Sequence, residues 1–162
     1  MQTAHKFNED YVLFLEAGFI AVNQSDEEAA IRLFKSCETL RPDNVMAKIG
    51  YGYLHLHKLE LKQACENFEQ ALEQEPNNDV AKALLGLCTS LQPKMADKGS
   101  SILAETAQSS DPYVKQMSTT ALNFVDRFVR KEEPPMRGGK MVKEASAASK
   151  HKKRKTPRRK KT

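Results

Sequence analysis

Apolar residues recur three and four positions apart along most of the chain, with polar residues between them. This spacing gathers apolar side chains on one face of an α-helix, so it predicts amphipathic helices. Clear examples are residues 80–87 and residues 113–130. We expect about seven helices between residues 8 and 131, paired antiparallel, and therefore an all-α domain at residues 8–133.

Four residue types recur after one fixed interval in this region. The matching pairs, each 34 residues apart, are Gly18 and Gly52, Ala30 and Ala64, Phe34 and Phe68, and Pro42 and Pro76. Glycine and alanine let helices approach closely, phenylalanine fills the space between them, and proline ends a helix. The interval is the period of the tetratricopeptide repeat, a helix-turn-helix unit.

Residues 11–42 and 45–76 resemble the tetratricopeptide repeat family, with Cys37 in place of an expected second alanine. A third unit begins at Gly86, but its second helix departs from the pattern. The alanine, aromatic and proline positions there hold Lys98, Ile102 and Ser110. The resemblance implies a tetratricopeptide-like solenoid of about three repeats, stacked in a short right-handed arc and closed by a C-terminal capping helix over residues 113–130.

In the tetratricopeptide fold, the first helix of each unit lines a concave surface. The resemblance therefore implies an apolar groove, which would suit an amphipathic helix or an extended apolar segment of a partner. The alternative for each of these residues is packing inside the repeats. The expected partner-binding residues are Val12, Leu15, Phe19, Met46, Ile49, Tyr53, Leu56, Val80, Ala83 and Leu87.

Some tetratricopeptide proteins grip the C-terminal carboxylate of heat-shock chaperones with Lys, Asn and Arg on this inner face. Here the corresponding positions hold residues that cannot bind a carboxylate through their side chains. They are Leu15, Phe19, Gly50, Val80 and Leu84. This function is therefore disfavoured.

A narrower resemblance rests on three repeats followed by a Ser-x-Asp-Pro turn at residues 109–112 and a last helix. In this order of elements, the chain is similar to needle-subunit chaperones of bacterial type III secretion. That family implies a cytoplasmic chaperone that holds the C-terminal amphipathic helix of a needle subunit, together with a small helical co-chaperone, and prevents premature polymerisation. A second alternative within type III secretion is a translocator chaperone.

Charge is unevenly distributed along the chain. Residues 134–162 hold twelve Lys and Arg against one acid, a charge of +11, whereas the 14 basic and 20 acidic residues before them give −6. This segment is poor in apolar residues, which predicts a disordered basic tail. The tail could contact nucleic acid or an acidic surface, so the main alternative is a nuclear or ribosome-associated adaptor. The expected phosphate contacts are Lys152, Lys153, Arg154, Lys155, Arg158 and Arg159.

The sequence gives little support for disulfides, a metal site, catalysis or membrane insertion. Three widely spaced cysteines, Cys37, Cys65 and Cys88, argue against a disulfide framework or zinc site and are expected to be free and buried. His55 and His57 lie two residues apart on a predicted helix, a poor metal-binding pair. Without a catalytic motif, we expect no enzyme activity and no cofactor. Because no secretory signal or membrane anchor is evident, a cytoplasmic location without membrane insertion is expected.

Overall fold

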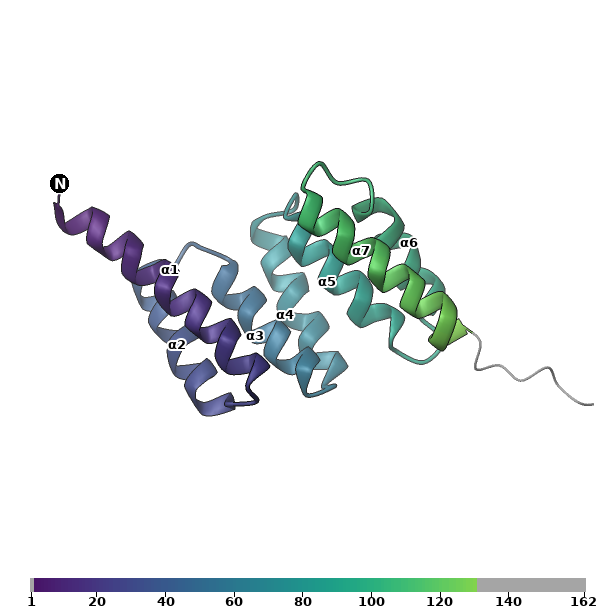
Figure 1. Ribbon diagram of the computed structural model, residues 1–162, viewed down its shortest axis with the longest axis horizontal. Coiled ribbons are helices and arrows are strands. Elements are labelled where there is room, and N and C mark those ends of the chain that lie inside the picture. Colours follow the sequence, from purple (N-terminus) through teal and green to yellow (C-terminus); the bar gives the residue numbers. More distant parts are fainter. Residues whose placement is uncertain (1, 131–162) are drawn as a thin grey trace, which may run out of the picture. The chain divides into compact units, whose positions relative to one another are not determined.

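The computed structural model describes residues 2–130, with side chains from residue 9 onward (Figure 1). Within this range there are seven α-helices and no strand, which confirms the all-α prediction and the number of helices. The first helix begins before residue 8, where the sequence predicted its start. The helices are α1 (Gln2–Asn23), α2 (Glu27–Leu40), α3 (Met46–His57), α4 (Leu61–Gln74), α5 (Asp79–Ser90), α6 (Ala96–Thr106) and α7 (Pro112–Phe124), and a π-helical turn, η1 (Val125–Val129), extends α7.

The chain divides into two units, Met1–Lys131 and Glu132–Thr162. The second unit lies outside the described residues, and so does the predicted basic tail. The same holds for the expected phosphate contacts Lys152, Lys153, Arg154, Lys155, Arg158 and Arg159. Across the part of the chain that is described, no helix combines the length and the apolar character needed to cross a membrane.

The helices form three consecutive pairs, α1 with α2, α3 with α4, and α5 with α6, and α7 follows (Figure 1). Short loops join the two helices of a pair, which therefore run antiparallel. The first helices of successive pairs also contact one another, α1 with α3 and α3 with α5, and α5 contacts α7 in the same way. The odd-numbered helices thus form one layer of this unit.

Side-chain caps fix where three helices begin. Asp26 accepts a hydrogen bond from the Ala29 amide at 3.0 Å, and Asn78 accepts one from the Ala81 amide at 2.9 Å. Asp111 caps α7, which begins at Pro112, the residue type favoured at a first helical position. The helix α7 begins at the end of the Ser-x-Asp-Pro turn that the sequence indicated at residues 109–112.

The fully buried ring of Phe34 holds the first two helix pairs together. A β-carbon added at Gly18 of α1, or at Gly50 of α3, would lie only 2.5 Å from this ring. Phe68 is placed in the same way against Gly52. These glycines are required because the rings occupy the space of a side chain, so the phenylalanine and glycine positions of the repeat form one packing unit.

The third pair follows the same plan with a longer turn, since five residues separate α5 from α6 whereas three separate the helices of each earlier pair. The second helices of the pairs begin at residues 27, 61 and 96, and the turns before them contain left-handed residues at Ser25, Leu59 and Lys94. The predicted equivalences of Lys98 and Ile102 are therefore wrong by one residue. Gly99 and Leu103, both buried, occupy the alanine and aromatic positions, while Lys98 is exposed.

This shift changes how the third pair packs. In place of an aromatic ring, the backbones of α5 and α6 approach each other directly at Gly86 and Gly99. A β-carbon at Gly99 would clash with the backbone nitrogen of Ser90 and the carbonyl oxygen of Gly86. Backbone atoms cannot rotate away as a side chain can, so this contact admits glycine alone.

We expect Gly99→Ala to lower the free energy of unfolding by about 1–3 kcal/mol, the usual cost of overpacking. Alanine favours helices more than glycine does, so a loss of stability would identify the steric clash as its cause. Urea denaturation followed by circular dichroism measures the change. Lys98→Ala, at the exposed neighbouring position, is the control and should leave stability nearly unchanged. Equal stability of the two variants would contradict the close approach.

Candidate partner-binding groove

An apolar groove of about 670 Å³ runs along the layer of odd-numbered helices. It is built by the end of α3 and the turn after it, the second half of α5, and one face of α7. Its residues are mostly aliphatic or aromatic, with two neutral polar side chains and no charged one. They are Leu56, Leu59, Leu87, Leu91, Tyr113, Gln116, Met117, Thr120, Ala121 and Phe124.

The last helix supplies six of the ten lining residues. On α7, the buried residues Val114, Ser118 and Ala121 face the rest of the fold. Tyr113 and Phe124, at opposite ends of the helix, remain 83% and 45% exposed. The helix therefore packs against the third pair and at the same time presents apolar side chains to the groove.

Leu59 at the rim of the groove has an unusual backbone conformation. Its φ is 58°, in the left-handed region that favours glycine, and its side chain is 72% exposed. Leucine gains no burial here, and this conformation costs about 1–2 kcal/mol for a residue with a β-carbon. Ser25 occupies the same turn position in the first pair. The left-handed conformation therefore belongs to this turn, which Lys94 repeats in the third pair, and Leu59 differs from Ser25 and Lys94 in carrying a large apolar side chain that is mostly exposed.

Ion pairs hold this turn on both sides of Leu59. Lys58 Nζ lies 2.7 Å from Glu27 Oε1 and 3.1 Å from Glu60 Oε1. His55 Nδ1 lies 2.7 Å from Glu60 Oε2. The hydrogen bond with His55, and then the one with Lys58, lowers the pKa of Glu60. The ionised Glu60 therefore stabilises the turn fully above the ordinary carboxyl pKa. This stabilisation is lost only as the pH falls through the lower pKa that Glu60 has in the folded chain.

Two of the ten predicted binding residues, Leu56 and Leu87, line the groove. Ile49 and Ala83 are buried in the interior. Val12 is exposed on α1. The remaining five are half-buried and pack against the core: Leu15, Phe19, Met46, Tyr53 and Val80.

Aromatic packing explains why the first pair does not extend this groove. The ring of Phe19 makes edge contacts with Phe34 at 5.4 Å and with Tyr53 at 5.6 Å between centroids. Tyr53 in turn donates a hydrogen bond to Asn23 Oδ1 at 2.9 Å. These side chains therefore join α1 to α3, and a charge introduced at Phe19 or Tyr53 would disturb folding as well as binding.

The predicted binding residues did not include Leu59 or any residue of α7. A signal for α7 was present, because Tyr113, Met117, Ala121 and Phe124 are spaced four, four and three residues apart along one helical face. For Leu59 the sequence offers no such signal, since leucine is an unusual residue in a left-handed turn.

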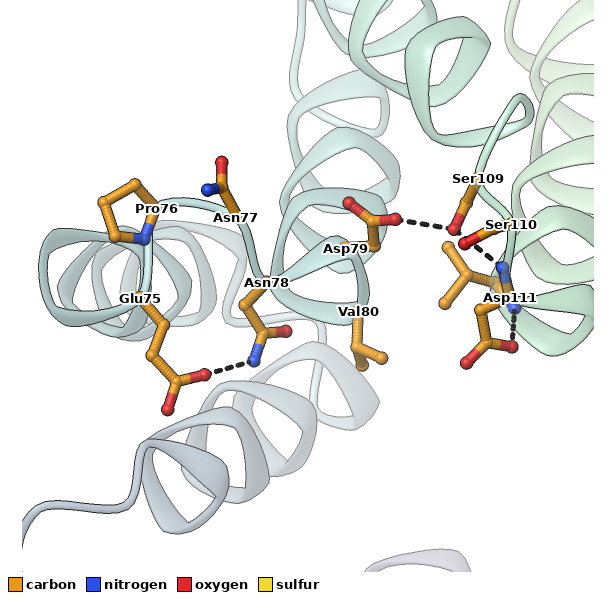
Figure 2. Close-up of a pocket in the computed structure, with 10 residues that line it drawn as sticks. Glu75, Pro76, Asn77, Asn78, Asp79, Val80, Ser109, Ser110 and Asp111 are labelled. Atoms are coloured by element: carbon orange, nitrogen blue, oxygen red, sulfur yellow. Dashed lines mark hydrogen bonds between the residues drawn. The ribbon is translucent and has the colours of Figure 1, made fainter.

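A second hollow, of about 560 Å³, lies between the loops that precede α5 and α7 (Figure 2). Its polar groups bind one another. Asn78 Nδ2 donates to Glu75 Oε2 at 2.9 Å, and Ser109 Oγ donates to Asp79 Oδ2 at 2.5 Å. Asp111 is occupied in capping α7. The Ser-x-Asp-Pro turn thus anchors α7 to the start of α5, and the apolar groove is the better candidate for binding.

The two histidines on α3 have different neighbours. His55 pairs with Glu60, whereas the ring of His57 lies 5.4 Å from that of Tyr53. In the described part of the chain, no three His, Cys, Asp or Glu side chains are grouped so that they could hold a metal ion.

No family model matches the chain, and neither a curated protein nor a solved structure matches it significantly. The groove must therefore be interpreted from its own geometry and chemistry.

We expect Leu59→Gly to leave the free energy of unfolding unchanged or to raise it by up to about 1 kcal/mol, because glycine adopts a positive φ without strain. Thermal and urea denaturation measure this effect. Leu59→Ala is the matched control, because it removes the same side chain but keeps a β-carbon at the positive φ, and it should be less stable than Leu59→Gly. A large loss of stability in Leu59→Gly would show that the leucine side chain is structural.

Proposed function

We propose that this chain is a tetratricopeptide-like repeat protein that binds another polypeptide in its apolar groove. The repeat assignment is supported by the 34-residue recurrence, by the equivalent left-handed turns at Ser25 and Leu59, and by the phenylalanine rings seated on glycines. In this interpretation α1, α3 and α5 are the first helices of three repeats, and α7 is the capping helix.

The groove itself is the observation that supports binding. Its lining carries no charge, and three of its apolar side chains, Leu59, Tyr113 and Phe124, are substantially exposed. Burying such a surface against an apolar partner stabilises a complex by roughly 25 cal/mol per Å² of apolar area before association costs. Parallel helices that form an open apolar trough suit an amphipathic helix laid along them. We therefore assign an amphipathic helix as the ligand.

The proposed biological role is that of a cytoplasmic chaperone in a bacterial type III secretion system. Its cargo would be the needle subunit, held by its C-terminal amphipathic helix, with a small helical co-chaperone completing the complex. The order of three repeats, a Ser-x-Asp-Pro turn and a last helix supports this role. A subunit that polymerises through the same helix would stay monomeric while the groove covers it.

The direct test uses a labelled peptide that carries the C-terminal helix of a needle subunit from the same cell. Phe124→Glu places a charge in the groove, and an unpaired charge facing an apolar ligand is costly. We expect its affinity for the peptide to fall at least about tenfold, or 1.4 kcal/mol. Fluorescence anisotropy measures the affinity, and circular dichroism verifies the fold.

Leu13→Glu is the matched control, because Leu13 is an exposed leucine, 61% accessible, on α1 outside the groove. It should bind the peptide as the unmodified chain does. Equal losses in both variants would contradict the groove assignment. Binding of a translocator segment in preference to the needle peptide would instead favour the translocator chaperone.

The nuclear or ribosome-associated adaptor depends on the basic run of residues 150–161. Truncation after Glu133 separates the two functions. We expect the truncated chain to keep its melting temperature and peptide affinity, and to lose any salt-sensitive binding to RNA or DNA. Titrations at low and high salt measure both affinities. Loss of peptide binding on truncation would make the tail part of the cargo site.

A further inference from the structure

Two of the three free cysteines face each other across neighbouring helices. Cys65 of α4 and Cys88 of α5 are both buried, and their Sγ atoms lie 2.9 Å apart. Cys37 lies elsewhere, and its Sγ is 3.8 Å from the carbonyl oxygen of Tyr11. The prediction that all three cysteines are free and buried is confirmed, but it did not reveal that two of them are paired in space.

We propose that Cys65 and Cys88 form a redox-active dithiol that a hydroperoxide converts to an intramolecular disulfide between α4 and α5. A disulfide requires about 2.0 Å between the sulfur atoms, so the two thiols need to approach by only about 0.9 Å. The helices α4 and α5 pack directly on each other and already hold the two thiols close together. The site is independent of what the groove binds.

The surroundings of the two sulfur atoms give them different roles. Cys65 is 8% exposed, whereas Cys88 and Cys37 are completely buried, so an oxidant reaches Cys65 first. Gln92 Nε2 lies 3.1 Å from the Cys65 sulfur and donates a hydrogen bond to it. Burial, and then the hydrogen bond with Cys65, raises the pKa of Cys88. Cys88 is therefore less suited than Cys65 to attack the peroxide, and its Sγ, 2.9 Å from that of Cys65, is placed to resolve an oxidised Cys65.

The reaction balances in two steps. The sulfur of Cys65 attacks the peroxide and takes one oxygen as a sulfenic acid, while the O–O bond breaks and the thiol proton leaves with the alcohol or water product. The sulfur of Cys88 then displaces this oxygen. A S–S bond forms, the S–O bond breaks, and the oxygen leaves as water with the Cys88 proton. Two thiols are oxidised by two electrons, and the peroxide is reduced by two. Small thiols reduce the disulfide back to two thiols by thiol–disulfide exchange.

The bond would join the second helix pair covalently to the third. Cys88 lies between Leu87 and Leu91, which both line the groove on α5. The disulfide would therefore fix α5, which forms the middle of the groove, against α4. Closing the chain between residues 65 and 88 also restricts the unfolded state, which predicts a higher melting temperature for the oxidised chain.

The experiment treats the full-length reduced chain with a small excess of hydrogen peroxide and analyses it by mass spectrometry without reduction. We expect a mass lower by two hydrogens, a peptide pair linked through Cys65 and Cys88, and an unmodified Cys37. Dithiothreitol should restore the original mass. Three thiols that remain reactive after denaturation, a bond that includes Cys37, or addition of oxygen without a cross-link would each overturn the proposal.

Single variants test the order of events. Cys88→Ser should accumulate a sulfenic acid on Cys65 that a cyclic 1,3-diketone traps, and Cys65→Ser should leave Cys88 reduced. Cys37→Ser is the control and should form the bond as the unmodified chain does. A sulfenic acid on Cys88 in the Cys65→Ser variant would refute the assigned roles. If a variant folds poorly, the mass measurement on the unmodified chain still decides whether the disulfide forms.

Discussion

Phenylalanine rings that pack against glycines set the spacing of the first four helices. Phe34 of α2 lies over Gly18 of α1 and Gly50 of α3, so that a single side chain joins three helices. The close fit leaves no space for a β-carbon, and dense packing of this kind makes each partner depend on the other. Edge contacts with Phe19 and Tyr51 surround the same ring. Phe34 thereby fixes α3 beside α1, and the end of α3 and the turn after it contribute Leu56 and Leu59 to the groove.

The elements that the sequence predicted well are those whose side chains have strong steric rules. Helical spacing of apolar residues located the helices, and the recurrence of glycine and phenylalanine located the contacts of the first two pairs. The Ser-x-Asp-Pro turn marked the start of the last helix, because the Asp111 carboxylate accepts hydrogen bonds from free amides. The third pair was misaligned because its extra residue falls in a turn, where Lys94 adopts a left-handed conformation that lysine rarely takes.

The groove was harder to predict than the fold. A repeat rule assigns equivalent roles to equivalent positions, yet Phe19 and Tyr53 pack into an aromatic cluster while Leu56 and Leu87 face the groove. Six of the ten lining residues come from α7, which carries no repeat signature. The facing thiols of Cys65 and Cys88 were likewise hidden, because residues 23 positions apart meet only through the packing of α4 on α5. Helix pairing is a tertiary property, and spacing along the chain does not determine it.

The two ways of packing a helix pair differ in how sequence change can be accommodated. At Gly52 the opposing atoms belong to the side chain of Phe68, so a larger residue at one position can be matched by a smaller residue at the other. At Gly99 the opposing atoms belong to the backbone, which every residue type shares. No second substitution can restore that fit. Over evolutionary time, the first two pairs can therefore drift by coupled exchanges, whereas the crossing of α5 and α6 has no compensating route and should hold its glycine unchanged.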